Sequence, residues 1–80
     1  MLVPLYGFVQ GDTLGLLVLV PEDETVRDVA ERLQQAAAVR VAPRPRVHVY
    51  FRGQRLDPAL TVTAAGLASL ERVDGVPADE

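Results

Sequence analysis

Residues 14–20, with the sequence LGLLVLV, carry apolar side chains on both alternating faces of a predicted strand. Successive side chains of a strand point to opposite sides of its sheet, so a strand with one solvated face alternates apolar and polar residues. Only one stretch of the chain has the spacing of a long helix, and one helix covers one face of a sheet. We therefore expect a partner protein to cover the second face.

Length and composition limit the chain to one small domain. Its 80 residues form a core of marginal size, so stability gained from a partner is plausible. The absence of cysteine excludes a disulfide scaffold and thiolate metal sites. The net charge of −3 argues against nucleic-acid binding, which relies on many cations. The N-terminus lacks a signal-peptide pattern, and no apolar run approaches the roughly 20 residues that cross a bilayer. We expect a cytoplasmic protein without membrane insertion.

The first half of the chain predicts a hairpin followed by a helix. Strands are expected at residues 2–10 and 13–20, joined by a turn at Gly11-Asp12. Thr25 and Asp28 have the spacing of a capping box, and apolar residues then recur at helical intervals. The helix is predicted at residues 26–38.

The second half predicts three more strands after a proline-rich connector at residues 40–45. Alternating residues indicate a strand at 46–52, and a short strand is expected around Arg55-Leu56. A helical turn at 61–67 ends at Gly66, and a last strand is predicted at 70–76. Residues 77–80 form a polar tail that we expect to be frayed.

This order of elements is that of an α+β β-grasp fold, in which a mixed four- to five-stranded sheet wraps one helix. The run FRGQRL at residues 51–56, followed by Thr61-Val62 and Gly66-Leu67, resembles the second half of ubiquitin-like domains. The helix capped by Thr25 after Pro21 resembles their first half. The resemblance implies one ubiquitin-like domain over residues 1–76. It implies little about function, because folds of this kind host many functions.

Four short segments resemble the small B, or gamma, subunit of bacterial toluene monooxygenases. They are VPL at residues 3–5, VRVAPR at 39–44, and GL at 66–67 with ERVDGV at 71–76. This resemblance implies a non-catalytic subunit that packs on the large, helical subunit of a multicomponent hydroxylase acting on aromatic or other hydrocarbons. It places the diiron cofactor in that partner and no cofactor in this chain.

The residues themselves offer no catalytic or metal constellation. His48 is the one histidine, and Ser69, the one serine, has neither a glycine-framed elbow nor a nearby base. The acidic residues 22–24 lie at the helix entry, where they interact favourably with the helix dipole. We expect no catalytic, cofactor-binding or metal-binding residues.

The outer face of the sheet is the candidate functional surface. If Val49 and its inward neighbours pack on the helix, alternation sends His48 and Tyr50 outward. In the strand predicted at residues 14–20, we expect Leu17 and Leu19 to face the helix. The other face of that strand then joins a patch of apolar and aromatic residues, typical of protein interfaces. Two connector arginines could also meet acidic residues of a partner. The expected interface residues are Tyr6, Phe8, Leu16, Val18, Arg40, Arg44, His48 and Tyr50.

Two other functions stay open. One is a free-standing ubiquitin-like adaptor, for example of a bacterial secretion system. The other is a sulfur carrier. That chemistry needs a C-terminal Gly-Gly, whereas this sequence ends Ala78-Asp79-Glu80, so a sulfur carrier would first have to be matured by proteolysis. Neighbouring oxygenase, ferredoxin and reductase genes would favour the hydroxylase subunit, whereas secretion genes would favour the adaptor.

Overall fold

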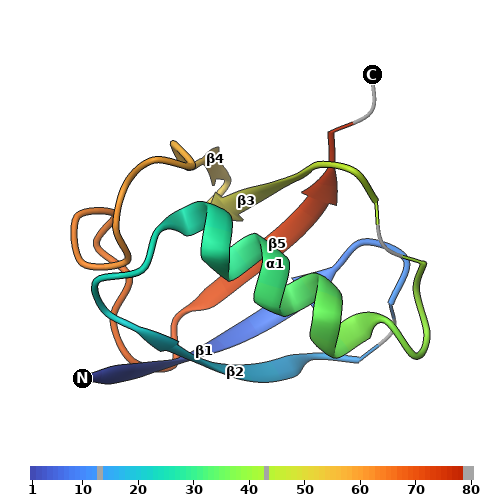
Figure 1. Ribbon diagram of the computed structural model, residues 1–80, viewed down its shortest axis with the longest axis horizontal. Coiled ribbons are helices and arrows are strands. Elements are labelled where there is room, and N and C mark those ends of the chain that lie inside the picture. Colours follow the sequence, from blue (N-terminus) through green and yellow to red (C-terminus); the bar gives the residue numbers. More distant parts are fainter. Residues whose placement is uncertain (13, 43, 79–80) are drawn as a thin grey trace.

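The computed structural model describes residues 1–12, 14–42 and 44–78, so the expectations for Thr13, Pro43, Asp79 and Glu80 lie outside the described residues. The elements are β1 (Leu2–Val9), β2 (Leu16–Pro21), α1 (Val26–Ala37), β3 (Val47–Phe51), β4 (Gln54–Arg55) and β5 (Arg72–Pro77). The strands form one sheet in the order β2-β1-β5-β3-β4, and α1 crosses one of its faces (Figure 1). Strands β1 and β5 are parallel, and the other neighbours are antiparallel. This is the predicted α+β β-grasp architecture.

The helix begins where the sequence predicts. The Thr25 hydroxyl accepts a hydrogen bond from the Asp28 N–H at 3.3 Å, and the Asp28 carboxylate accepts one from the Thr25 N–H at 3.0 Å. These two bonds complete a capping box. The Thr25 N–H and the Thr25 hydroxyl both donate to the Asp28 carboxylate and hold the pKa of Asp28 below its usual value. One apolar stripe of the helix is buried on the sheet: Val26, Val29, Ala30, Leu33 and Ala37.

The facing of β2 differs from the prediction. Val18 is 7 % exposed and Val20 is fully buried, whereas Leu17 and Leu19 are 59 % and 52 % exposed. Leu16 packs partly buried against the core. The prediction that Leu17 and Leu19 face the helix, with Leu16 and Val18 outward, is therefore wrong.

Pairing with β1 explains this facing. Val20 lies opposite Val3, and Val18 lies opposite Leu5. Cross-strand partners share a face, and both β1 residues are buried beneath α1. Every residue of β2 is apolar, so its own composition could not select the buried face; the register of the hairpin selects it.

The helix approaches the sheet closely at one point. Leu33 is fully buried against Gly7 of β1, and a Cβ atom at Gly7 would collide with the Leu33 side chain. On the neighbouring strand, a Cβ at Gly75 would lie 3.7 Å from Leu33 Cδ1 and 3.2 Å from Val47 Cγ1. Glycines on β1 and β5 thus leave the space that Leu33 fills.

The C-terminal strand begins and ends later than the predicted residues 70–76. It extends to Pro77, which pairs with Val47, and the Ala78 N–H donates to the Arg46 carbonyl at 3.0 Å. The prediction of a frayed tail is therefore wrong for Pro77 and Ala78, because both continue along β3.

Candidate functional site

The face of the sheet opposite α1, called here the outer face, divides into two halves of different chemistry. We assign residues to the outer face by alternation along each strand, because the neighbouring residues in the same strand are buried toward α1. The apolar half comes from β1 and β2 and comprises Leu2, Pro4, Tyr6, Leu17 and Leu19. The polar half comes from β5, β3 and β4, with Val76 as its one apolar member among the strand residues, and comprises Arg72, Asp74, Val76, His48, Tyr50 and Arg55.

The apolar half is a contiguous patch. Tyr6 lies opposite Leu17, and Pro4 lies opposite Leu19. The exposed fractions are 47 % for Tyr6 and 55 % for Leu2, close to those of the two leucines of β2. Single exposed apolar side chains are ordinary on protein surfaces, whereas a contiguous group on adjacent strands is typical of an interaction site.

Phe8 lies where the two halves meet. Its half-buried ring faces Arg72, whose guanidinium carbon is 4.1 Å from the ring centroid. Arg72 also donates to the Asp74 carboxylate, which is 3.1 Å from Nη2. A Cβ at Gly15 would come within 2.8 Å of the same ring, so Phe8 reaches across to the segment before β2. The outward position predicted for Tyr6 and Phe8 is confirmed.

The polar half contains the two residues of β3 that the sequence assigns to this face. His48 and Tyr50 alternate with Val49, which is buried beneath α1, so they lie on the outer face as predicted. Tyr50 pairs with Asp74 of β5 and with Arg55 of β4. The Arg55 guanidinium is 3.4 Å from His48 Nε2. These polar groups can form the rim of an interface whose centre is the apolar half.

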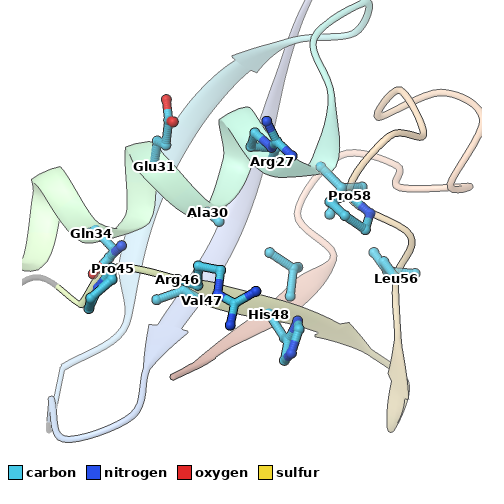
Figure 2. Close-up of a pocket in the computed structure, with 12 residues that line it drawn as sticks. Arg27, Ala30, Glu31, Gln34, Pro45, Arg46, Val47, His48, Leu56 and Pro58 are labelled. Atoms are coloured by element: carbon cyan, nitrogen blue, oxygen red, sulfur yellow. The ribbon is translucent and has the colours of Figure 1, made fainter. Parts of the chain in front are cut away.

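A surface groove of about 490 Å³ lies between α1 and β3 (Figure 2). Arg27 and Pro58 lie at one end, with Arg46 and His48 along the strand side, and Glu31 points away from the groove in Figure 2. The acid–base side chains among its lining residues are Glu31 and His48. Without a nucleophile or a facing acid–base pair, the groove has no arrangement for covalent or general acid–base catalysis.

Arg40 is bound within this chain. Its guanidinium donates to both carboxylate oxygens of Asp12, with the shortest distances at 2.9 Å. The Asp12 side chain is 1 % exposed and that of Arg40 is 33 % exposed. The hydrogen bond to this carboxylate raises the pKa of Arg40 above its usual value. Arg40 thus ties the segment after the helix to the turn of the first hairpin, and its predicted partner contact stays a prediction.

The backbone groups of Arg44 are hydrogen-bonded to a side chain of α1. The Gln34 side-chain amide donates to the Arg44 carbonyl at 3.0 Å and accepts from the Arg44 N–H at 2.6 Å. This pair fixes the connector beside α1 and leaves the partner contact predicted for Arg44 untested.

The sequence analysis missed several members of the outer face: Leu2, Pro4, Leu17, Leu19, Arg55, Arg72, Asp74 and Val76. For Leu17 and Leu19 the missing signal was the length of the loop between β1 and β2, because loop length sets which residues of two paired strands share a face. Asp12 was missed for another reason: its partner is 28 residues away, beyond any local pattern.

In residues 1–12, 14–42 and 44–78, no three His, Cys, Asp or Glu side chains gather as potential metal ligands. No helix in these same ranges has the length and apolar character needed to span a membrane.

A family model described as toluene-4-monooxygenase system protein B matches residues 2–76. A chain of the structure "Toluene 4 monooxygenase HD Complex with Inhibitor 4-Bromobenzoate" is 26% identical with a TM-score of 0.88, covering 95% of this chain and 98% of that one. A chain of "Molecular Mimicry of SUMO promotes DNA repair" is 27% identical with a TM-score of 0.76, covering 94% and 90%. A ubiquitin of Caldiarchaeum subterraneum, 16% identical with a TM-score of 0.77, covers 100% and 98% and confirms the ubiquitin-like fold. No curated protein matches the chain.

Proposed function

The chain belongs to the toluene-4-monooxygenase system protein B family, and we propose from this that it is a small, non-catalytic subunit of a multicomponent monooxygenase hydroxylase. It packs on the large subunit of that hydroxylase, which carries the diiron cofactor and oxidises an aromatic hydrocarbon. The assembly belongs in the cytoplasm. A similar chain occurs in the toluene 4-monooxygenase complex, and this supports the proposal.

The apolar half of the outer face is the observation that carries this function. Leu2, Tyr6, Leu17 and Leu19 are each about half exposed and lie together on one face. Burying such side chains contributes roughly 25 cal/mol per Å² of apolar area removed from water. A chain with this patch is suited to assembly with a partner.

The proposed interface keeps most of the predicted residues. Tyr6 and Phe8 contribute to its centre, and His48 and Tyr50 to its rim. Leu17 and Leu19 replace Leu16 and Val18, which are turned toward the core. Arg40 and Arg44 remain proposed contacts at its periphery.

Co-expression with the hydroxylase genes and size-exclusion chromatography test the proposal. We expect the wild-type chain to co-elute stoichiometrically with the large subunit. Leu17→Asp places a charge in the apolar half and should weaken assembly at least about tenfold. The thermal unfolding of the free variant should change little, because Leu17 is 59 % exposed.

Val39→Asp is the matched control, because Val39 is an apolar residue that is 84 % exposed and lies outside the outer face. It should assemble like the wild type. Tyr50→Asp tests the polar half in the same way. Equal assembly of Leu17→Asp and Val39→Asp would show that the apolar half is not the interface, and a wild-type chain that elutes alone would refute the subunit function.

A further inference from the structure

The two edges of the sheet are protected very differently. At one edge, β4 has two residues, and Arg52, Asp57 and Pro58 lie close to it in the chain. At the other edge, β2 has six residues; Pro21 ends it and acidic residues 22–24 follow, but no charged residue or proline occurs in residues 14–20. Proteins commonly guard exposed edges with short strands, charges, prolines or bulges. The β4 edge is guarded along its whole length, whereas the β2 edge is guarded only at its C-terminal end and stays open along residues 14–20.

The backbone of β2 offers free hydrogen-bonding groups along this edge. The Glu22 N–H donates to the Met1 carbonyl, so Leu2 and Pro21 form a pair without mutual hydrogen bonds. Antiparallel ladders alternate, and the N–H and C=O groups of Leu17 and Leu19 therefore point away from β1. No residue in the described ranges forms a backbone bond to these groups from outside the β1–β2 ladder.

The residues with free backbone groups also carry the most exposed side chains of the strand. Leu17 and Leu19 project from the outer face, and Leu14, just before the strand, is 52 % exposed. The open edge and the apolar half are thus continuous through the same two leucines. An occupant that satisfies the edge therefore also lies against the apolar half.

We propose that an extended, apolar segment of a hydroxylase subunit adds to β2 as a sixth strand and hydrogen-bonds to the backbone of Leu17 and Leu19. Strand addition to an open edge is a known way for sheets to bind a partner, with backbone bonds fixing the register and side chains giving specificity. The inference rests on the proposed function and specifies how the subunit binds.

A second copy of the chain fits this surface less well. Two copies joined at their β2 edges would form one continuous sheet, and their apolar halves would lie side by side on the same face. The exposed side chains of Leu2 and Tyr6 would then stay in water on both copies. A larger partner can supply a strand to the edge and also cover the face beside it.

Residue-resolved hydrogen exchange of the co-expressed complex tests the inference. The amides of Leu17 and Leu19 should exchange roughly 100-fold more slowly in the complex than in the free subunit. The Val18 amide is an internal control, because it points toward β1 in both states and should change far less. Unchanged exchange at Leu17 and Leu19 in a stable complex would overturn strand addition while leaving the subunit function intact.

A pair of substitutions separates the backbone bond from side-chain packing. Leu19→Pro removes a donor that points away from β1, which is where a strand tolerates proline. Leu19→Ala also removes the leucine side chain but keeps the N–H. Leu19→Pro should weaken assembly about tenfold more than Leu19→Ala, because a partner carbonyl then loses its donor. Equal weakening by the two would overturn the inference, and the circular dichroism of each free variant verifies its fold.

Two further outcomes distinguish the occupants. A concentration-dependent dimer of the free chain, with slow exchange at Leu17 and Leu19, would assign the edge to a second copy and overturn the inference. A wild-type chain that does not co-elute with the hydroxylase would overturn the proposed function and this inference together.

Discussion

Gly7→Ala tests the close approach of the helix to the sheet. The added Cβ would collide with Leu33 Cδ2 and lie 3.2 Å from Leu33 Cγ. Leu33 is fully buried and cannot turn into solvent, so either the helix or the strand has to shift. Gly7→Ala should therefore destabilise the fold, although alanine ordinarily suits a strand better than glycine.

The expected loss follows from two opposing effects. Overpacking a well-packed core costs roughly 1–3 kcal/mol. Replacing glycine lowers the conformational entropy of the unfolded chain, which raises the free energy of unfolding by about 0.4–1 kcal/mol. The free energy of unfolding should fall by about 1–2 kcal/mol, which lowers the Tm of a domain of this size by roughly 5–15 °C.

Leu33→Val shows whether Leu33 is the cause, because valine lacks the Cδ2 atom. We expect Leu33→Val alone to cost about 1 kcal/mol and the double variant to be less destabilised than the sum by roughly 1 kcal/mol. Thermal and urea unfolding, followed by circular dichroism, provide the values. Gly75→Ala is the comparison, since its Cβ would meet Val47 Cγ1 at 3.2 Å and should be better tolerated. An unchanged Tm for Gly7→Ala, or strict additivity with Leu33→Val, would refute the reasoning.

Three other predictions concern the cap and the Asp12 ion pair. Thr25→Ala removes the hydroxyl that accepts from the Asp28 N–H and should lower the free energy of unfolding by about 1 kcal/mol; an unchanged urea midpoint would contradict it. The folded-state pKa of Asp28 lies below its usual 3.8, so its contribution is present above about pH 4 and is lost as the pH falls through that lowered pKa. Asp28→Asn should therefore flatten this part of a plot of Tm against pH. Arg40→Gln should lower the Tm by removing the pair with Asp12, and high salt should narrow the difference from wild type; equal Tm values at low salt would contradict it.

Local patterns predicted the helix well. The capping box depends on residues three positions apart, and the buried stripe depends on residues three and four positions apart. Both patterns can therefore be recognised within a short window of sequence. The alternation of β3 was equally informative, because polar and apolar residues there differ on the two faces. Val49 is buried and its neighbours His48 and Tyr50 point outward, as expected.

Long-range pairing set the features that the sequence did not reveal. Arg40 forms an ion pair with Asp12, which lies 28 residues earlier in the sequence, and the Ala78 N–H donates a hydrogen bond to the Arg46 carbonyl beside the end of β5. Gly7 looks like an ordinary strand glycine until Leu33 is placed above it. These contacts depend on how the elements meet, and no local spacing encodes them.

The all-apolar run of β2 shows the same division between sequence and tertiary structure. The sequence by itself determined that this strand carries more apolar surface than one helix can cover, because both of its faces are apolar. Only the tertiary structure decided that Val18 and Val20 enter the core while Leu17 and Leu19 face outward. The physical reason is that a shift of one residue in register exchanges the two faces of a strand, and pairing with β1 beneath α1 fixed that register.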